Sequence, residues 1–388
     1  MIPYGRQDIS QDDIDAVVEV LTSDFLTQGP KVPEFESKVS EYCGAKHGVA
    51  VNSATSALHI ACLALDIGPG DIVWTSPISF VASANCVLYC GGTVDFVDIN
   101  PDTFNMSADE LRSKLEAAEK LDKLPKAVIP VHMAGQSCDM AAIYDLSQQY
   151  GFKIIEDASH AIGGSYKDSK VGSCKYSDMT VFSFHPVKII TSAEGGMVMT
   201  NDSKLSEKLR LNRSHGITRD PELMTREPHG PWYYEQVSLG YNYRMSDMQA
   251  ALGISQMDRL DDFVSRRTEL SELYNKGLQH LPIQIPMTLN QCQSSWHLYI
   301  IRIPDSAKNM SRQKVFQEFQ NNNLNVNVHY IPITQQPYYR NVLSNIENLE
   351  NADRYYESAI TLPLYPELIA GEYKKIIQIT DNIITSML

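Results

Sequence analysis

Short β-rich runs alternate with helical patterns from about residue 45 to residue 200 of this chain. Strands are expected at 48–51, 71–76, 93–99, 127–131, 153–157, 179–184 and 196–200, and helices at about 55–65, 80–90, 107–120 and 140–150. Consecutive strands that are joined through helices lie parallel in one sheet, and the connecting helices cover both of its faces. The alternation therefore predicts an α/β fold built on a large, mostly parallel sheet.

The pattern changes after Tyr243. Residues 244–281 form one long helical stretch, in which Ser246 and Gln249 have the spacing of an N-terminal capping box. Mixed elements follow, with strands expected at 297–303 and 325–330 and a helix at about 311–322. We therefore expect two domains. They are a large domain over 1–245, with an N-terminal arm over 1–30, and a smaller C-terminal α+β domain over 246–388.

The composition argues against nucleic acid and membranes as partners. The 388 residues carry 33 basic against 47 acidic side chains, a net charge of −14, whereas nucleic-acid binding favours a basic surface. No segment reaches the roughly 18 apolar residues that span a bilayer, and the N-terminus lacks the pattern of a signal peptide. The seven cysteines include no CxxC pair, so we expect free thiols and no metal site. These features predict a cytoplasmic protein.

The segment IIEDASHA, residues 154–161, places an acidic residue at the end of an expected strand. Ligands of open α/β sheets bind at the carboxyl ends of the strands, so Asp157 is a candidate to contact a ligand. The alternative is an ordinary helix N-cap, a role that Asp often takes.

The segment FSFHPVKIITSAEGG, residues 182–196, carries Lys188 in a loop after another expected strand. Apart from His185, the residues around this lysine are uncharged from Thr180 to Ala193. A lysine in a loop is usually solvated, but in a largely apolar setting its pKa falls and it can form a Schiff base.

The segment VNSATSALHIACLAL, residues 51–65, leads from a strand through small hydroxylated residues into a helix. Ser53, Thr55, Ser56 and the free N–H groups of the helix start can bind an anion such as a phosphate. The alternative is a capped core helix without a ligand.

Together the three segments supply what pyridoxal 5′-phosphate (PLP) requires. A carboxylate keeps the pyridine nitrogen protonated, so that the ring withdraws electrons. A lysine holds the aldehyde and moves protons, and a helix start holds the phosphate. A dinucleotide enzyme is disfavoured, because GPGDIV at 68–73 leads into a strand, whereas a Rossmann glycine loop follows a strand and opens a helix.

Beyond these segments, the sequence resembles the DegT/StrS family of nucleotide-sugar aminotransferases, which are fold type I PLP-dependent transferases with an aspartate aminotransferase-like fold. The matching pieces occur in the family's order over nearly the whole chain. They are TQGPKVPEFE (27–36), NSATSALH (52–59), SFVASANCV (79–87), EDASHA (156–161), SFHPVK (183–188), EGG (194–196), RSHGI (213–217), LGYNYRMSDMQAALG (239–253) and VHYIPI (328–333).

The resemblance implies a role for each matching residue. Lys188 would hold the cofactor as a Schiff base and act as the acid–base group, and Asp157 would pair with the pyridine nitrogen. The other implied cofactor contacts are the backbone N–H near Ala54, Thr55, Ser56 and Ser183 at the phosphate, Phe80 on the ring face, His160 near the phenolic oxygen, and Asn242 from the partner protomer. The resemblance thus implies a homodimer with shared active sites. Ala54 stands where the family often has Gly, which matters only if that backbone needs a positive φ.

Within the family, NSATSALH, SFHPVK and RSHGI most resemble the aminotransferases of pseudaminic acid synthesis. This implies transfer of the amino group of L-glutamate to C4 of a UDP-linked 4-keto-6-deoxy-N-acetylhexosamine. Arg244, His329 and Tyr330 are the candidates for binding the sugar nucleotide, and ordinary packing and surface roles are the alternative for them.

Three other functions stay open at this point. One is amination at C3 or C4 of a dTDP- or GDP-linked keto sugar. Another is a PLP dehydratase of the same family, which is disfavoured because such enzymes typically carry His where this chain has Lys188. The third is a non-catalytic PLP-binding regulator, although nothing in the sequence resembles an appended DNA-binding module.

Overall fold

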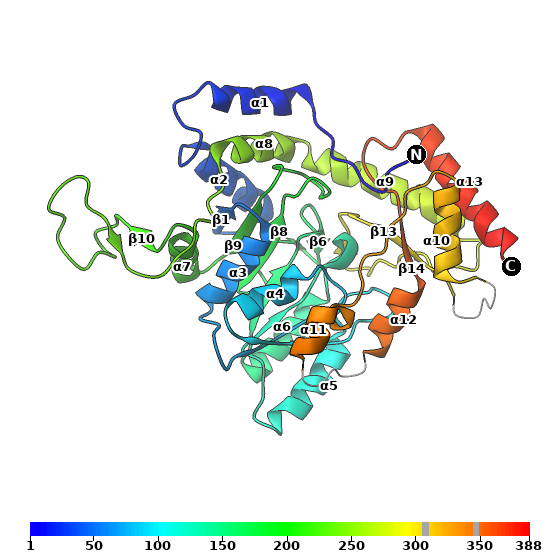
Figure 1. Cartoon of the computed structure of the whole chain (residues 1–388), viewed down its shortest axis with the longest axis horizontal. Helices are drawn as coiled ribbons and strands as arrows, with labels where there is room; N and C mark the ends of the chain where they lie inside the picture. The colour runs from blue at the N-terminus through cyan, green and yellow to red at the C-terminus, as the bar shows by residue number, and fades with distance from the viewer. Residues whose placement is uncertain (305–309, 344–348) are drawn as a thin grey trace.

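The computed structural model describes residues 1–304, 310–343 and 349–388. At its centre lies a seven-stranded sheet in the order β1-β9-β8-β5-β4-β2-β3 (Figure 1). The strands are β1 (His47–Val51), β2 (Ile72–Thr75), β3 (Thr93–Phe96), β4 (Ala127–Ile129), β5 (Lys153–Asp157), β8 (Met179–Ser183) and β9 (Gly196–Thr200). β9 runs antiparallel to both of its neighbours, and the other pairs are parallel. The predicted α/β fold with a mostly parallel sheet is confirmed.

Both faces of this sheet are buried. Successive side chains of a strand point to opposite sides of the sheet, so neighbouring residues pack into different hydrophobic clusters. Val49 packs into one hydrophobic cluster with α3 and α4, whereas its neighbour Ala50 packs into another with α2 and α8. Val73 and Trp74 divide in the same way, and Trp74 faces α5 and α6. These helices are α2 (Lys31–Cys43), α3 (Ala54–Ala64), α4 (Ala82–Tyr89), α5 (Ala108–Glu119), α6 (Met140–Tyr150) and α8 (Asp247–Asp258). Each strand therefore reads as a continuous apolar run.

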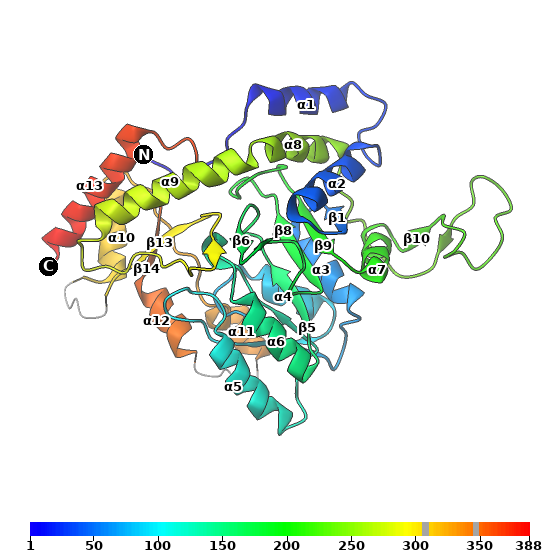
Figure 2. The ribbon, with the colours of Figure 1, turned by 180° about the vertical axis from the view of Figure 1, so that it is seen from behind.

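A second core lies in the C-terminal part of the chain. The antiparallel pair β13 and β14 packs there with three helices around a separate hydrophobic cluster. These elements are α9 (Leu260–Leu278), β13 (Tyr299–Arg302), α10 (Arg312–Asn321), β14 (Ala359–Leu362) and α13 (Ala370–Ser386). The single long helix expected after Tyr243 is two helices, α8 and α9, which meet at Arg259 and lie nearly end to end (Figures 1 and 2).

The predicted capping box is present at the start of α8, where Ser246 and Gln249 bond reciprocally. α8 packs against α1 (Gln11–Leu21) and α2 rather than against the C-terminal core. The two-domain division at residues 245 and 246 stays a prediction, and this packing favours a division farther along, within α9.

The strand expected at 325–330 does not form. The segment pairs with β14 only at Asn327, through a bridge to Thr361, while Asn325 bonds to the backbone of Ile2 near the N-terminus. Beyond Asn327 the chain leaves the strand pair and lines a cavity with His329 and Tyr330. The prediction of a strand here is wrong, because among the described residues only Asn327 of this segment has a bridge partner.

A hairpin projects from the body next to α7 (Ser203–Arg213), and both views show it standing clear of the sheet (Figures 1 and 2). It is built on β10 (Ile217–Thr218) and β11 (Glu235–Gln236). The remaining short elements are η1 (Met133–Gly135), β6 (Ser165–Tyr166), β7 (Ser169–Lys170), β12 (Cys292–Gln293), η2 (Ile333–Gln335), α11 (Pro337–Val342) and α12 (Glu350–Ser358). Among the helices of the described residues, none combines the length and the apolar character that a membrane span needs.

Candidate active site

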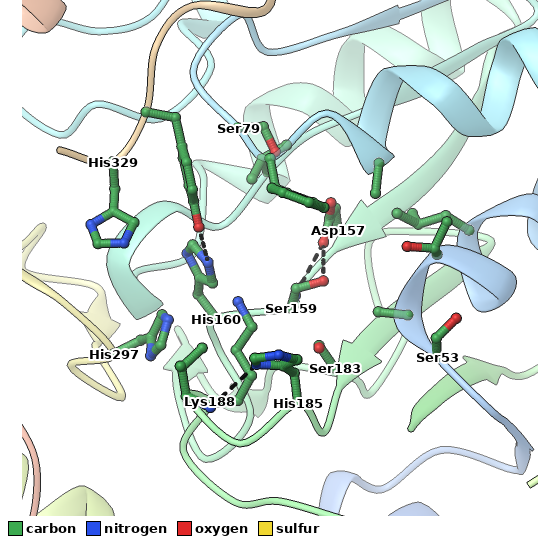
Figure 3. A pocket seen from close by; sticks show the side chains of 18 of the residues that line it. Ser53, Ser79, Asp157, Ser159, His160, Ser183, His185, Lys188, His297 and His329 are labelled. Atoms are coloured by element: carbon green, nitrogen blue, oxygen red, sulfur yellow. Dashed lines mark hydrogen bonds between the residues drawn. The ribbon is translucent and has the colours of Figure 1, made fainter. Parts of the chain in front are cut away.

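A cavity of about 490 Å³ lies at the carboxyl ends of β5 and β8, beside the start of α3. Figure 3 shows His160, His297 and His329 along one wall, Asp157 and Ser183 across from them, and Lys188 reaching into the space between. The site predicted at the strand ends therefore coincides with a cavity large enough for a small ligand.

Asp157 is the last residue of β5, and hydrogen bonds hold both of its carboxylate oxygens. Oδ2 accepts from Ser83 Oγ at 2.6 Å, and Oδ1 accepts from the N–H and the hydroxyl of Ser159 at 3.1 and 2.6 Å. The residues that follow form turns and no helix, so the N-cap alternative is excluded. The bonds fix the carboxylate at the cavity wall, where a ligand can contact it.

Lys188 lies in the loop after β8, with its amine inside the cavity and protein around it. Burial lowers the pKa of this amine to about 8, and the Asp157 carboxylate opposes part of the shift. A lysine with such a pKa has a useful fraction of neutral, nucleophilic amine near neutral pH. The tertiary fold that buries the amine is the physical cause of this property.

Attachment of PLP to the protein without cofactor should accelerate as the pH rises, with a midpoint near pH 8. The reason is that only the neutral Lys188 amine attacks an aldehyde, and the pKa of that amine is about 8. The change in PLP absorbance after rapid mixing measures the rate. A rate that levels off only near the ordinary lysine pKa of about 10.4 would show that the amine is solvated and would contradict the buried setting.

The start of α3 forms the anion-binding side of the cavity. Ser53 caps this helix, since its hydroxyl accepts the Ser56 N–H at 3.1 Å. The first N–H groups of a helix have no partner within it, and Ala54 and Thr55 line the cavity at this point. A helix start with free N–H groups attracts a phosphate.

Backbone packing explains two residues near this helix start. A Cβ atom on Gly196 would lie 2.6 Å from backbone atoms of Ser53 and Ala54, so only glycine lets β9 pass so close. Ala54 itself is the first residue of α3 and does not have a positive φ. The glycine that the family often has at this position is therefore not required here.

Two further predicted cofactor contacts line the cavity. Ser183 ends β8 and lies near the start of α3 in Figure 3. Phe80 is 60% exposed, and its ring centroid lies 6.4 Å from that of Tyr330. An aromatic ring left open inside a cavity offers its face to a planar ligand.

The predicted residues His160, His329 and Tyr330 form part of one wall. His160 Nε2 lies 3.2 Å from Tyr330 Oη, and His329 Nδ1 lies 2.8 Å from Thr361 Oγ1. Burial, together with the Lys188 charge, lowers the pKa of His329 to about 3 and holds the pKa of His160 well below its usual value. Both imidazoles are therefore neutral at physiological pH.

Three predicted residues do not line the cavity. The Ser56 hydroxyl donates to Asn52 Oδ1 at 2.7 Å, and Arg244 donates to Ser214 Oγ at 3.1 Å. Asn242 forms an isolated backbone bridge with Ser214. The roles of Ser56, Arg244 and Asn242 stay predictions.

The sequence reasoning missed several cavity residues. These are Tyr4, Ser79, Ser159, His185, Glu194 and His297. Glu194 gave a usable signal, because it is an acidic residue close behind Lys188 in a stretch that is otherwise uncharged. Tyr4 and His297 gave none, because only the tertiary fold brings them to the cavity.

The residues present fit PLP part by part. The cavity offers a carboxylate for the pyridine nitrogen, a lysine of lowered pKa for the aldehyde, a helix start for the phosphate and an open aromatic face for the ring. These groups lie around one space, as the chemistry of the cofactor requires.

Comparisons with known proteins agree with this site. Residues 7–380 match the DegT/DnrJ/EryC1/StrS aminotransferase family. The chain is 38% identical over 386 residues to the spore coat polysaccharide biosynthesis protein SpsC of Bacillus subtilis, covering 99% of this chain and 97% of that protein. It is also 38% identical over 371 residues to the UDP-4-amino-4,6-dideoxy-N-acetyl-β-L-altrosamine transaminase of Campylobacter jejuni, covering 95% and 93%.

Among solved structures, the chain resembles Helicobacter pylori PseC, an aminotransferase involved in the biosynthesis of pseudoaminic acid. The TM-score is 0.90 at 33% identity, and the match covers 99% of both chains. Aminotransferases of this family depend on PLP, which the cavity fits. The chain therefore belongs to the DegT/DnrJ/EryC1/StrS family, as a PLP-dependent sugar aminotransferase.

Proposed function

We propose that this protein transfers the amino group of L-glutamate to C4 of a UDP-linked 4-keto-6-deoxy-N-acetylhexosamine, as in pseudaminic acid synthesis. The observation that carries the proposal is the likeness, over nearly the whole chain, to the Campylobacter transaminase and to PseC. The cavity supports it, because Lys188 and Asp157 face one space there.

Bound PLP supplies an electron sink that makes the α-hydrogen of the amino donor acidic. Lys188 Nζ reaches into the same space and has a neutral fraction, so it can take up that proton and return it at the neighbouring reacting carbon. In the second half of the cycle the same atom moves a proton in the opposite direction, and the amine remains on the sugar. Asp157 faces the cavity as a fixed acceptor for the pyridine N–H.

The sugar nucleotide is proposed to contact His329 and Tyr330, which line the cavity, and Arg244. His329 is neutral and is oriented by Thr361, so it suits hydroxyl and carbonyl groups of a sugar ring. Among the described residues that line the cavity none is an arginine. We propose Arg244, which lies outside the cavity lining, as a positive partner of the diphosphate.

The active protein is proposed to be a homodimer in which Asn242 reaches the phosphate of PLP in the partner protomer. Asn242→Ala should weaken PLP retention by about ten- to a hundredfold, the worth of one hydrogen bond to a charged group. Equilibrium dialysis of the cofactor measures this change. Asn321→Ala, on an exposed helix end, is the matched control and should bind PLP normally.

Mixed dimers test directly whether each active site combines Lys188 of one protomer with Asn242 of the other. One protomer carries Lys188→Ala and the other Asn242→Ala, so that sharing leaves one of the two sites intact. Activity should then recover to a substantial fraction of the wild-type value. If each protomer used its own Asn242, both sites would be damaged and no recovery would be seen.

The substrate is tested by incubating the PLP-loaded protein with L-glutamate and a panel of UDP-, dTDP- and GDP-linked keto sugars. Mass spectrometry detects the aminated product, and NMR assigns the carbon and its configuration. We expect amination at C4 of the UDP-linked 4-keto-6-deoxy-N-acetylhexosamine. Turnover of another nucleotide sugar, with none of this one, would overturn the proposed substrate.

A second candidate is amination at C3 or C4 of a dTDP- or GDP-linked keto sugar. It is kept because the chain is equally similar, at 38% identity, to the spore coat polysaccharide protein of Bacillus subtilis. The same panel separates the two candidates.

A further inference from the structure

Two buried serines form a hydrogen-bond chain that ends on the Asp157 carboxylate. Ser79 Oγ lies 2.6 Å from Ser83 Oγ, and Ser83 Oγ lies 2.6 Å from Asp157 Oδ2. Ser79 is 5% exposed and lines the cavity, whereas Ser83 is 1% exposed and lies in the first turn of α4. A serine hydroxyl at a helix start usually bonds to nearby backbone. The hydroxyl of Ser83 instead reaches the end of a strand that is distant in sequence.

The direction of the two bonds follows from the number of hydrogens. An ionised carboxylate only accepts hydrogen bonds, and a serine hydroxyl has one hydrogen to donate. Ser83 donates it to Asp157, because the carbonyl of Phe80 lies farther away, at 3.3 Å, and carries no full charge. The bond between the two serines then requires Ser79 to donate. The chain therefore runs from Ser79 through Ser83 to Asp157.

The bonds at Asp157 leave one carboxylate oxygen less occupied than the other. Oδ1 accepts from the N–H and the hydroxyl of Ser159, which lies beside Asp157 in Figure 3. Among the residues that the structure describes, Oδ2 has Ser83 as its one hydrogen-bond donor. Each carboxylate oxygen offers about two lone-pair sites, so Oδ2 keeps a place for a further donor. We therefore expect the N–H of the PLP ring at Oδ2.

We propose that Ser83 is a positioning residue of the aminotransferase, which directs Asp157 Oδ2 to the ring nitrogen of PLP and keeps the shared proton on that nitrogen. A hydrogen bond donated to a carboxylate stabilises its charged form, so Ser83 makes the carboxylate a weaker base. Ser79 strengthens the effect, because the bond that Ser83 accepts polarises its hydroxyl. The inference rests on the proposed role of Asp157 at the ring nitrogen and is independent of which sugar is aminated.

The test uses PLP labelled with ¹⁵N at the ring nitrogen and bound to the protein without any sugar. In the wild type, the ¹⁵N NMR signal should have the position of a protonated ring. In Ser83→Ala, it should move towards the position of the neutral ring, because the more basic carboxylate takes up part of the proton. Ser83→Thr keeps the hydroxyl and should restore the wild-type signal. Ser79→Ala should move the signal in the same direction by a smaller amount.

Ser271→Ala is the matched control. Ser271 is also 1% exposed within a helix, and its hydroxyl donates to the Thr268 carbonyl of that same helix at 2.7 Å. Its loss removes a hydroxyl of equal burial and should leave the ¹⁵N signal of PLP at the wild-type position. Equal shifts in Ser271→Ala and Ser83→Ala would show a general loosening of the protein and would overturn the proposal. A larger shift in Ser79→Ala than in Ser83→Ala would contradict the order of the chain.

The activity measurement uses the PLP-loaded enzyme with the substrate that the panel identifies. Ser83→Ala should lower kcat by roughly tenfold, since it loses one hydrogen bond to a charged group. KM for the keto sugar should stay within about threefold of the wild type, and Ser83→Thr should recover most of the lost kcat. A wild-type kcat together with a wild-type ¹⁵N signal in Ser83→Ala would overturn the proposal, because packing alone would then explain the residue.

Asp157→Asn separates the failure of this inference from that of the proposed function. An unchanged ¹⁵N signal in Asp157→Asn would show that the carboxylate does not meet the ring nitrogen, and both would fail. A signal that moves in Asp157→Asn but not in Ser83→Ala would overturn this inference alone. If Ser83→Ala does not fold, Ser83→Cys replaces it, because a thiol is a weaker donor of similar size. A wild-type signal in Ser83→Cys would then overturn the role of Ser83.

Discussion

Lys188→Ala is expected to abolish transamination while the protein still folds and binds PLP without a covalent link. The amine is the proposed point of attachment and the proposed carrier of the transferred proton, and a positioned acid–base group typically contributes 10²–10⁴-fold. We therefore expect a loss of at least about a thousandfold in kcat, because both roles disappear together. Steady-state assay with L-glutamate and the keto sugar measures the loss.

Borohydride reduction provides the independent check. In the wild type, it should leave the cofactor covalently attached to the peptide that contains Lys188, and in Lys188→Ala no such peptide should appear. Lys204→Ala, on the exposed side of α7, is the control and should match the wild type in both measurements. Attachment to a peptide without residue 188 would show that a different lysine carries the cofactor.

Asp157→Asn is expected to have the second largest effect. An amide cannot hold the pyridine nitrogen in its protonated form, so the ring loses much of its power to withdraw electrons. We expect kcat to fall by about a hundredfold or more, as when a fixed electrostatic partner is removed from other active sites. The absorbance spectrum of bound PLP should change in parallel.

The fold should tolerate this substitution. The Asn carbonyl oxygen can still accept the two bonds from Ser159, and its NH₂ group can donate to Ser83 Oγ, a hydroxyl that also accepts. Loss of the carboxylate should also lower the pKa of Lys188 further, because Asp157 raises it in the wild type. Asp145→Asn, exposed on α6, is the control. Near-normal kcat in Asp157→Asn would refute the electron-withdrawing role.

Much of the large sheet could be predicted from the sequence, because its strands are buried on both faces and therefore read as continuous apolar runs. The direction of a strand has no such signature. Gly196–Thr200 looks like the other strands, yet β9 inserts antiparallel between β1 and β8. The segment 325–330 shows a second difficulty. Its alternating pattern predicts a strand, but the pattern does not show whether a partner strand lies close enough to pair with it.

Part of the site could also be predicted, because some of its residues stand at strand ends or helix starts that the local sequence marks. Asp157 and Lys188 follow strands whose carboxyl ends meet at one edge, and Thr55 opens a helix, so local sequence places all three. His160 and Phe80 were assigned through the family resemblance, and both line the cavity. His297 and Tyr4 could not be found, because neither stands at a strand end or helix start that the pattern marks as a ligand site.

The cavity walls come from both ends of the polypeptide, from Tyr4 near the N-terminus to His329 and Tyr330 far along the chain. A ribosome builds the lysine loop more than a hundred residues before it builds the last wall. Because the N-terminal part of a chain folds first during synthesis, the nascent protein passes through a stage in which the lysine loop exists but the pocket that buries its amine does not. We therefore expect stable loading with cofactor only after the segment that carries His329 and Tyr330 has been synthesised.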